Sequence, residues 1–550
     1  MDLLIVAGTS RSSGYRPDST TAIGERTAGR LSGYVLAFCL LFVSVLAQAG
    51  DRSFSPAPEF PANLPWLNVS KPLSLRELRG KVVVLDFWTY GCINCLHVAD
   101  ELKKLEAQFG DRLLVISVHS PKFDNERDLE TLKRNVIRYD LRHPVVQDED
   151  FHLMQAYGAR AWPTLAVIDP EGRYVARLVG ENVQDRLEKI IDFLLLKHVD
   201  DINPDPIPLA LLQQVRNATG LAGPGKVAAG AGIVAVSDTL NHRVVIADQS
   251  GKVMSVFGGE EGFTDGARLE ARFRSPQGVL VDNGRVYVAD AGNHAVRMID
   301  IQSNTVSTLA GTVQVGRRLD FAAAANARGV DLRSPWALAL NGASLYIAMA
   351  GSHQIWVLDL STGRLSVFAG TGREGIDDGP ARQATFSQPS GLALAGRNLF
   401  VVDAEASALR RIDLESGLVD TLVGTGLFDF GDGDGPFEVA QLQHPGGIAV
   451  LGDGTLLVAD TYNHKLRRVD LSERRVTTVA GSGEPGPGNR VGEDTLLNEP
   501  SGVAVSGDLV LVADTNNDRL LRYDAARGRL AEWKLEWAPA DEPAAQSPGR

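Results

Sequence analysis

Cysteine is scarce in this chain, which has 3 cysteines among 550 residues. Cys39 lies in an apolar leader, so only Cys92 and Cys95 remain if that leader is removed. Two cysteines cannot supply a four-thiolate zinc site, and the sequence has no second C-x-x-C pair. In an oxidising compartment an isolated pair is either a structural or a redox-active disulfide. A two-residue spacer closes too small a loop to constrain the unfolded chain much, which favours the redox use.

Positive charge is also limited, with 55 Lys and Arg against 68 Asp and Glu and a formal net charge of −13. No run of clustered Lys and Arg occurs, so a nucleic-acid-binding surface is not expected. The sequence has no cluster of residues typical of a heme or metal site, and we expect no cofactor. A chain of this length is too long for one ordinary core, which indicates two or more domains.

Long hydrophobic runs are rare, and the prominent one covers residues 34–47. It is shorter than the roughly 20 residues that span a bilayer and fits the core of a signal peptide. Ala47-Gln48-Ala49 follows it as an A-x-A cleavage signal. We therefore expect residues 1–49 to be a signal peptide and the protein to be exported, periplasmic or otherwise extracytoplasmic. The alternative is an uncleaved membrane anchor formed by residues 34–49.

The C-x-x-C pair lies between a predicted strand and a predicted helix. Residues 82–88 form a nearly continuous apolar run, typical of a buried central strand. Residues 96–109 have apolar side chains at helical spacing. Unpaired backbone N–H groups and the positive end of the helix dipole favour a thiolate on Cys92, and Cys95 lies one turn further along. This arrangement predicts a thiol–disulfide site.

Strands and helices alternate through residues 58–199, which we predict to be the first domain. Further strands are expected over residues 113–118, 165–168 and 174–179, and further helices over residues 127–139, 151–157 and 183–196. Residues 200–221 begin with a stretch crowded with Asp, Pro and Leu and are predicted to be a linker.

The sequence V-L-D-F-W-T-Y-G-C-I-N-C, followed about 70 residues later by W-P-T, resembles the thioredoxin fold. The match is closer to the TlpA/DipZ-like branch, whose members carry F-W-T-Y-x-C-I-N-C and an inserted segment before the cis proline. Residues 120–150 occupy the place of that segment. The resemblance implies an α/β thioredoxin-like domain.

The resemblance also implies roles for individual residues. Cys92 corresponds to the exposed nucleophile and Cys95 to the buried resolving thiol, and the two form the disulfide. Asp86 corresponds to the buried acid that relays a proton to the second cysteine, while a strand-end carboxylate with only a structural role is the alternative. Pro163 is expected to be cis, so that the backbone of Trp162 offers an edge to an extended substrate.

Two departures from the thioredoxin pattern adjoin the cysteines: Gly91 replaces the usual Trp, and Ile-Asn replaces Gly-Pro between them. Such residues help to set the reduction potential, so its value and direction stay open. A peroxiredoxin is the nearest rival enzyme, because residues 89–92 satisfy T-x-x-C. That family needs a proline where Leu85 stands. His97 and His119 are assigned no catalytic role.

The second half of the chain consists of six versions of one unit. Its repeated anchor positions lie 52 to 59 residues apart, at Asp238, Asp290, Met349, Asp403, Asp460 and Asp514. Four short strands per unit at this period predict a β-propeller, and six units predict six blades over residues 222–536. The Asn-His pairs at 241–242, 293–294 and 463–464 resemble the signature of NHL repeats. Residues 537–550 are rich in Ala, Pro and Glu and are predicted to be disordered.

The recurrence of the Asp and Asn-His positions favours a structural use, because a residue required once per blade usually fixes a turn. A loop at residues 428–435 places Asp429, Asp432 and Asp434 close together in sequence, and a calcium site there is a less favoured alternative. The loops on the faces of a propeller are the usual place for a binding partner.

The order of the two domains resembles the family of NHL repeat-containing protein 2 and its bacterial relatives. The leader and the C-x-x-C motif lead us to expect an exported thiol–disulfide oxidoreductase whose propeller docks a protein. Its partners would be a disulfide-containing protein substrate and an external thiol reductant or oxidant. One alternative is a non-catalytic scaffold in which the propeller binds and the thioredoxin-like domain is structural. A peroxiredoxin-like peroxidase is a lesser alternative.

Overall fold

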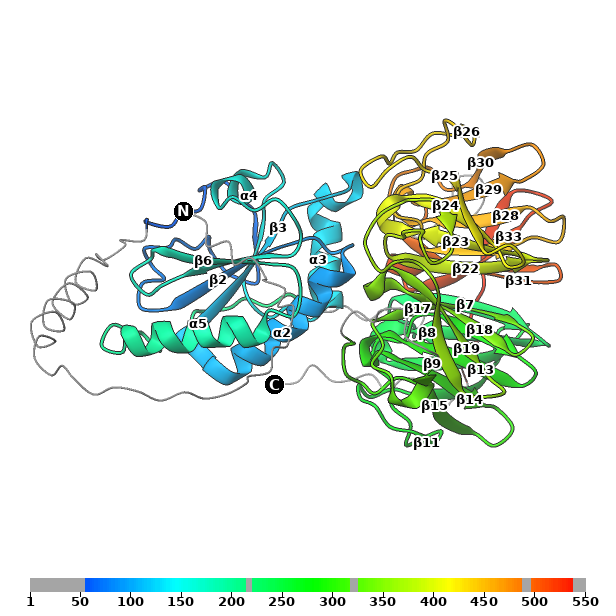
Figure 1. Cartoon of the computed structure of the whole chain (residues 1–550), viewed down its shortest axis with the longest axis horizontal. Coiled ribbons are helices and arrows are strands. Elements are labelled where there is room, and N and C mark those ends of the chain that lie inside the picture. The colour runs from blue at the N-terminus through cyan, green and yellow to red at the C-terminus, as the bar shows by residue number, and fades with distance from the viewer. Residues whose placement is uncertain (1–54, 214–219, 317–324, 487–495, 538–550) are drawn as a thin grey trace, which may run out of the picture. The chain divides into compact units, whose positions relative to one another are not determined.

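The computed structural model describes residues 55–213, 220–316, 325–486 and 496–537 (Figure 1). The predicted signal peptide, with Cys39, lies outside the described residues, and so do residues 538–550 of the predicted tail. Within the described ranges, no helix is both long and apolar enough to cross a bilayer.

A six-stranded mixed sheet forms the first domain, with strand order β1-β4-β3-β2-β5-β6. Its strands are β1 (Trp66–Leu67), β2 (Val82–Trp88), β3 (Leu113–His119), β4 (Val145–Gln147), β5 (Thr164–Ile168) and β6 (Tyr174–Val179). Its helices are α2 (Ile93–Phe109), α3 (Leu129–Arg138), α4 (His152–Ala156) and α5 (Gln184–Lys197), with 3-10 turns η1 (Gly110–Arg112) and η2 (Asp124–Arg127). The thioredoxin-like α/β prediction is confirmed.

Strand β2 is the centre of this domain, and all of its residues are buried. It pairs in parallel with β3 and antiparallel with β5. Alternate side chains point to opposite faces: Val84 packs with α2 and α5, whereas Leu85 and Phe87 pack with α4. Burial on both faces explains why the sequence here is an unbroken apolar run.

Every strand and helix expected in the first domain is present, with small shifts at the ends. The sequence did not predict β1 and β4, because strands of two and three residues are too short to show a period. The predicted helix over residues 127–139 begins later, at Leu129. Asp128 caps it by accepting the N–H of Thr131 at 2.7 Å, after the separate turn η2.

The first part of the predicted linker packs against the thioredoxin-like domain. The backbone N–H of Asn203 donates to Gly80 O at 2.8 Å, and that of Ala210 donates to Asn68 O at 2.8 Å. These bonds hold the chain to the domain before it enters the propeller.

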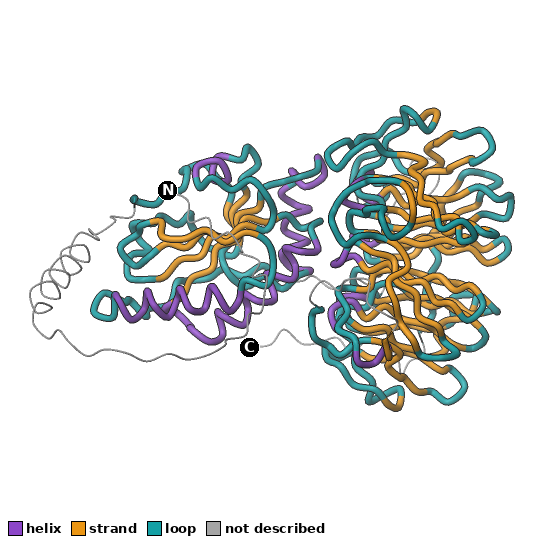
Figure 2. The backbone as a smooth tube through the Cα atoms, viewed as in Figure 1, coloured by secondary structure: helices purple, strands orange, loops and turns teal. Residues whose placement is uncertain are grey.

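Six blades, each a sheet of consecutive antiparallel strands, form the propeller (Figure 2). Blades 1 to 3 contain β7 (Pro224–Gly230), β8 (Ile233–Asp238), β9 (Arg243–Asp248) and β10 (Val253–Gly258); β11 (Gly266–Ala267), β12 (Val279–Asp282), β13 (Arg285–Asp290), β14 (Ala295–Asp300) and β15 (Thr305–Ala310); β16 (Ala325–Asn326), β17 (Pro335–Asn341), β18 (Ser344–Met349), β19 (Gln354–Asp359) and β20 (Arg364–Ala369).

Blades 4 to 6 contain β21 (Gly379–Pro380), β22 (Pro389–Ala395), β23 (Asn398–Asp403), β24 (Ala408–Asp413) and β25 (Leu418–Val423); β26 (Gly435–Pro436), β27 (Gly447–Val450), β28 (Leu456–Asp460), β29 (Lys465–Asp470) and β30 (Arg475–Ala480); β31 (Pro500–Ser506), β32 (Leu509–Asp514), β33 (Arg519–Asp524) and β34 (Arg529–Glu532). The prediction of six blades is confirmed.

The expectation of four strands per unit is wrong for blades 2 to 5, which have five. In each of them a two-residue strand from the Gly-rich loop pairs with the outermost strand, as β11 does with β15. In blade 2 the side chain of Asp265 holds this loop by accepting the N–H of Thr308 at 2.9 Å. A Gly-rich loop carries no strand pattern, so the sequence did not show this pairing.

The ring closes where the end of the propeller meets blade 1. The N–H of Val253 donates to Glu536 O at 2.9 Å, and the N–H of Glu536 donates to Gly251 O at 2.8 Å. Trp537 lies next, and the guanidinium of Arg243 sits 5.0 Å from its ring centroid. Trp537 therefore packs on blade 1, and its assignment to a disordered tail is wrong.

The repeated Asp and His positions join parts of the blades. Asp290 accepts hydrogen bonds from Arg274 N, Asn293 Nδ2 and Arg297 Nη1 at 2.8, 2.8 and 2.9 Å. His294 Nδ1 accepts the N–H of Ser334 in the next blade at 3.1 Å. The structural interpretation of these repeats is confirmed, because their polar groups fix turns and link neighbouring blades.

Blade 3 lacks the buried Asp–Arg pair that blade 2 has in Asp290 and Arg297. Met349 stands at the Asp position, and Trp356 stands where blade 2 has Arg297. The indole N–H of Trp356 donates to Gln354 Oε1 at 3.1 Å. Loss of the acid and of the arginine together leaves no unpaired charge, which explains why one blade can do without both.

Candidate active site

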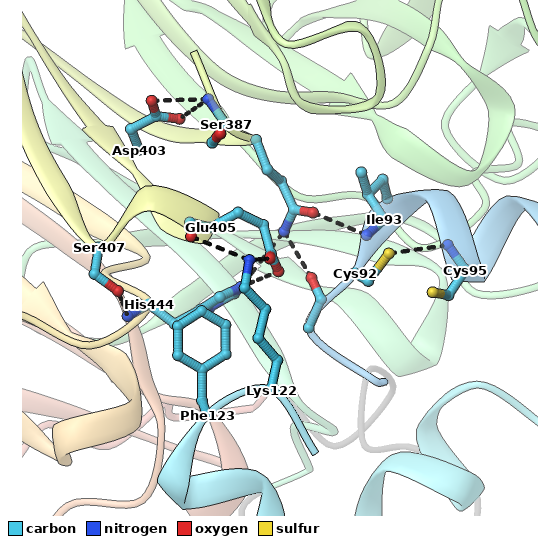
Figure 3. Close-up of polar contacts among 12 residues, drawn as sticks. Cys92, Ile93, Cys95, Lys122, Phe123, Ser387, Asp403, Glu405, Ser407 and His444 are labelled. Carbon is cyan, nitrogen blue, oxygen red and sulfur yellow. Dashed lines mark hydrogen bonds and ion pairs between the residues drawn. The ribbon is translucent and has the colours of Figure 1, made fainter. Parts of the chain in front are cut away.

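Cys92 is the N-cap residue of α2, directly after the loop that follows β2. Its sulfur accepts the backbone N–H of Cys95 at 3.3 Å (Figure 3). The first turn of α2 has no acidic residue. The helix dipole and this N–H therefore favour negative charge on the Cys92 sulfur.

The two cysteines have different surroundings, and both are free thiols in this structure. Cys92 is partly exposed, whereas Cys95 is fully buried. Burial raises the pKa of the Cys95 thiol well above its usual range, and its hydrogen bond to Cys92 adds to this effect. Negative charge is therefore disfavoured on Cys95.

Asp86 lies on strand β2, six residues before Cys92, and is fully buried. Burial raises the pKa of Asp86 to about 7. Ser117 Oγ donates to Asp86 Oδ2 at 3.4 Å, and Oδ1 has no hydrogen-bond partner among the described residues. A carboxyl group that titrates near neutral pH can both accept and release a proton there.

A polar chain runs from Asp86 towards the protein surface. Ser117 Oγ lies 2.8 Å from His143 Nε2, and His143 Nδ1 lies 3.1 Å from Glu106 Oε1. The Ser117 and His143 side chains are buried, while that of Glu106 is 28% exposed. Sequence reasoning missed His143, because only the packing of α2 and the loop before β4 against β3 brings these groups together.

The Trp162–Pro163 peptide bond is cis, as predicted. Thr164, the next residue, begins β5 and pairs with Phe87 at the end of β2. Trp162 and Cys92 pack against the same apolar cluster. The structure therefore brings the predicted substrate edge to the end of β2 that leads to the dithiol.

Propeller side chains also reach the dithiol, which the sequence did not indicate. Gln388 Nε2 donates to Gly91 O at 2.8 Å, and Gln388 Oε1 accepts the N–H of Ile93 at 2.8 Å (Figure 3). Lys122, in the loop after β3, forms an ion pair with Glu405 of blade 4. Through Gln388, blade 4 thus contacts the residues immediately before and after Cys92, namely Gly91 and Ile93.

The contact with the propeller explains the glycine at position 91. A Cβ atom there would lie 2.8 Å from the Tyr462 hydroxyl and 2.9 Å from Glu126 Oε1. It would also lie 3.2 Å from His444 Nε2. The tryptophan usual at this position in thioredoxins has no room, because Tyr462 and His444 of blade 5 occupy the space.

Several propeller residues in this interface share one place in the repeat, immediately before the proline at or just before strands β7, β12, β17, β22, β27 and β31. Ser334 Oγ lies 2.7 Å from His97 Nε2, and Glu499 Oε1 accepts from Asn125 Nδ2 at 2.9 Å. The six residues at this place are Gly223, Ser275, Ser334, Gln388, His444 and Glu499. Variation at one position among otherwise similar repeats is the signal that could have found this surface.

The two histidines without an assigned role are buried. Burial lowers the pKa of His119 to about 3, and its ring stacks on Tyr90 with centroids 5.4 Å apart. His97 Nδ1 lies 2.6 Å from Glu181 Oε1. Neither histidine is bonded to a cysteine, which agrees with packing and interface roles.

The acidic loop considered for calcium uses its carboxylates within blade 5. Asp432 pairs with Arg467 at 2.7 Å, and Asp434 accepts the N–H of Thr478 at 2.9 Å. Blade 2 uses Asp265 in the same way, so these residues close the blade and the calcium interpretation is not supported. Among the described residues, one group has the spacing of metal ligands, namely Glu171, His198 and Asp201, and it includes two exposed carboxylates.

Comparison with known proteins agrees with this geometry. The Thioredoxin-like family matches residues 80–174, and the NHL repeat family matches residues 273–297, 442–468 and 497–523. The first domain is 31% identical over 146 residues to the thiol-disulfide oxidoreductase ResA of Halalkalibacterium halodurans, a match that covers 26% of this chain and 80% of ResA. Fold and site thus define a thioredoxin-like domain, related to thiol–disulfide oxidoreductases, joined to a six-bladed NHL propeller.

The chain is 39% identical over 512 residues to NHL repeat-containing protein 2 of Homo sapiens, which covers 85% of this chain and 70% of the human protein. It belongs to the NHL repeat-containing protein 2 family. It is also 38% identical over 524 residues to SUPPRESSOR OF QUENCHING 1, chloroplastic, of Arabidopsis thaliana, covering 89% of this chain. The chain spans 49% of the length of that plant protein.

Proposed function

We propose that this protein is a thiol–disulfide oxidoreductase in which Cys92 is the nucleophile and Cys95 the resolving thiol. The observation that carries the proposal is the N-cap geometry, in which Cys92 sulfur accepts the Cys95 N–H at 3.3 Å. Partial exposure of Cys92 and full burial of Cys95 support the same division of roles. A merely structural disulfide does not need this asymmetry.

In the reducing direction, the Cys92 thiolate attacks a substrate disulfide. A Cys92–substrate disulfide forms, and the other substrate sulfur leaves as a thiolate that takes a proton from water. Cys95 then gives its proton to Asp86 and attacks Cys92 Sγ, which releases the second substrate thiolate. The protein gains the Cys92–Cys95 disulfide and has passed two electrons to the substrate. An external thiol reductant restores the dithiol, and an oxidant would drive the reverse reaction.

A Cys95→Ala variant tests the first step. Without a resolving thiol, the mixed disulfide on Cys92 should accumulate and be visible on a non-reducing gel, with the bound chain identified by mass spectrometry. The Cys92→Ala variant is the matched control and should capture nothing. If the two variants capture the same chains, or neither captures any, Cys92 is not the nucleophile of such a reaction.

The reduction potential separates this function from the scaffold alternative. A cycling pair should equilibrate with a glutathione or thioredoxin buffer. An inert structural disulfide would have a potential far below about −300 mV. The peroxidase alternative is tested by measuring peroxide consumption by the reduced protein. A rate no greater than that of the Cys92→Ala variant would exclude this alternative.

We further propose that the propeller helps to dock the protein substrate. Phe428, in the Gly-rich loop of blade 5, is 68% exposed, and Lys122 Nζ lies 5.2 Å from its ring centroid. This places an exposed aromatic ring beside a residue of the dithiol region, and such rings often anchor interfaces. In the Cys95→Ala background, Phe428→Ala should reduce capture. Leu269→Ala, which removes an 86% exposed side chain on blade 2, should not.

Export is proposed from the apolar leader at residues 34–47. Amino-terminal sequencing of the protein from its native cell should begin at Gly50 if Ala49 is the cleavage point. Recovery of the full leader in the membrane fraction would indicate the anchored alternative.

A further inference from the structure

Gln388 is the propeller residue most directly bonded to the dithiol loop. Its amide oxygen accepts from Ile93 N at 2.8 Å, and its amide nitrogen donates to Gly91 O at 2.8 Å. The side chain is 7% exposed. These two bonds connect to the residues on either side of Cys92, so one amide fixes the backbone before and after the nucleophile.

The backbone of Gln388 is itself held by the blade. It has a left-handed φ of 64° and precedes Pro389. Its N–H donates to His353 Nδ1 of blade 3 at 3.1 Å. Blades 2 and 3 carry the shorter Ser275 and Ser334 at the same place. The repeat therefore supplies a rigid position, and the glutamine there supplies the length to reach α2.

We propose that Gln388 is a positioning residue for Cys92, so that blade 4 of the propeller completes the dithiol site. The proposal rests on the thiol–disulfide function proposed above. The first N–H groups of a helix have no partner within the helix. Gln388 satisfies that of Ile93, which leaves the Cys95 N–H directed at the Cys92 sulfur. The amide thereby holds the loop in the conformation in which the helix end supports a thiolate.

The surroundings of this loop contain charges of both signs. Lys122 and Glu405 form an ion pair, and His444 Nε2 lies 3.6 Å from Glu405 Oε1. Glu126 accepts the N–H of Gly91 at 3.2 Å. The backbone N–H of Cys95, whose thiol is also titratable, donates to the Cys92 sulfur at 3.3 Å. A neutral amide at position 388 adds no net charge to this set, whereas a carboxylate would place a negative charge beside the helix start.

The test is the pH profile of Cys92 alkylation by iodoacetamide, measured by mass spectrometry on the full reduced chain. Gln388→Glu keeps the size of the side chain but adds negative charge and loses the donor to Gly91 O. We expect its alkylation rate at pH 7 to fall about tenfold and its profile to move to higher pH, because the charge disfavours the thiolate. Gln388→Met removes both hydrogen bonds without adding charge. Its alkylation rate at pH 7 should lie between the rates of Gln388→Glu and the wild type.

Asn516→Asp is the matched control, because Asn516 contacts Arg138 in the same interface and is not bonded to the dithiol loop. Its profile should coincide with that of the wild type. If the Gln388→Glu and wild-type profiles coincide, or if Asn516→Asp shifts equally, Gln388 does not position Cys92. Alkylation needs no protein substrate, so this result is independent of whether the Cys95→Ala trap captures a partner.

Discussion

Lys122 and Glu405 form a buried ion pair although they lie 283 residues apart in the chain. Their side chains are 5% and 6% exposed, respectively. Burial alone lowers the pKa of Lys122, but the Glu405 carboxylate outweighs this effect and the net shift is upward. Burial likewise opposes ionisation of Glu405, yet Lys122 and His444 hold its pKa at about 2. The propeller thus neutralises a buried cation of the thioredoxin-like domain.

We expect Glu405→Gln to destabilise the protein, because it leaves Lys122 buried without its counter-charge. The cost of breaking such a pair is about 3–5 kcal/mol. Urea unfolding at pH 7 measures it. The pKa of Glu405 is about 2 when folded against a usual 4.5, so its stabilisation is complete above pH 4.5 and is lost as the pH falls towards 2.

The control for this prediction is Glu415→Gln, because the Glu415 side chain is 75% exposed in its ion pair with Arg397. Exposed pairs contribute little to stability, so the urea midpoint should stay at the wild-type value. Equal midpoints for the wild type and Glu405→Gln would show that the buried pair does not hold the domains together.

We expect Asp86→Asn to stabilise the folded protein at alkaline pH while impairing the resolving step. The pKa of Asp86 is about 7 when folded against a usual 3.8, so the wild type loses stability as the pH rises from 3.8 through 7. Replacing the acid removes this loss, with a gain on the order of 4 kcal/mol above pH 8. Urea unfolding at pH 5 and pH 8.5 should show the gain mainly at the higher pH.

The same variant should resolve mixed disulfides slowly at neutral pH. In the wild type the rate at which Cys95 releases a bound thiol should change around pH 7, and this inflection should be absent from Asp86→Asn. A retained inflection would assign the titration to another group.

The polar chain from Asp86 leads to a prediction about Ser117→Ala. This change removes the link between Asp86 and His143, so the proton taken up by the acid loses its connected route towards Glu106. We expect the resolving step to slow several-fold and its solvent isotope effect to change, as followed by stopped-flow fluorescence.

Ser120→Ala is the matched control on the same side of the domain. Ser120 is also buried, but its hydroxyl donates to Asp148 at 3.4 Å and not to Asp86. The resolving rate of this variant should equal that of the wild type. Equal slowing of both variants would point to a general packing effect.

Gly91→Ala should weaken the contact between the thioredoxin-like domain and blade 5. The added methyl group would meet Tyr462 at 2.8 Å and Glu126 at 2.9 Å, and overpacking of this kind costs about 1–3 kcal/mol. Faster proteolysis of residues 200–221 and a lower urea midpoint are expected. Gly329→Ala is the control, because no atom lies within 4 Å of its added Cβ. If Gly91→Ala has the proteolysis rate and urea midpoint of the wild type, the interface accommodates the methyl group and position 91 does not require glycine.

The buried arginine of blade 2 provides a test of the structural role of the repeats. Arg297 is fully buried and pairs with Asp290 at 2.9 Å and Asp265 at 2.6 Å. Burial raises the pKa of Asp290 to about 6 even with this arginine present. Arg297→Met should therefore cost about 3–5 kcal/mol in urea unfolding. The double variant Arg297→Met with Asp290→Met should recover part of the loss, whereas no recovery would contradict a paired role.

Much of the fold was predictable because its signals are local. The apolar run of β2, the helical spacing in α2 and the W-P-T sequence are each formed by residues that are close together in the chain. The blades were recognisable because six units repeat the same short pattern. The extra strand of blades 2 to 5 was missed, since two residues in a Gly-rich loop carry no period.

The sequence predicted a dithiol site at Cys92 and Cys95, because strand, dithiol and helix follow one another directly along the chain, and the resemblance to thioredoxins added Asp86. It could not identify Gln388, Glu405 or His143. Their contacts depend on segments that meet only after the sheet and the ring of blades have formed, and Gln388 lies 295 residues from Ile93. Hydrogen bonds and ion pairs act over about 3–4 Å in space, whatever the separation in sequence. For that reason, the tertiary structure decided what surrounds the dithiol and why position 91 is glycine.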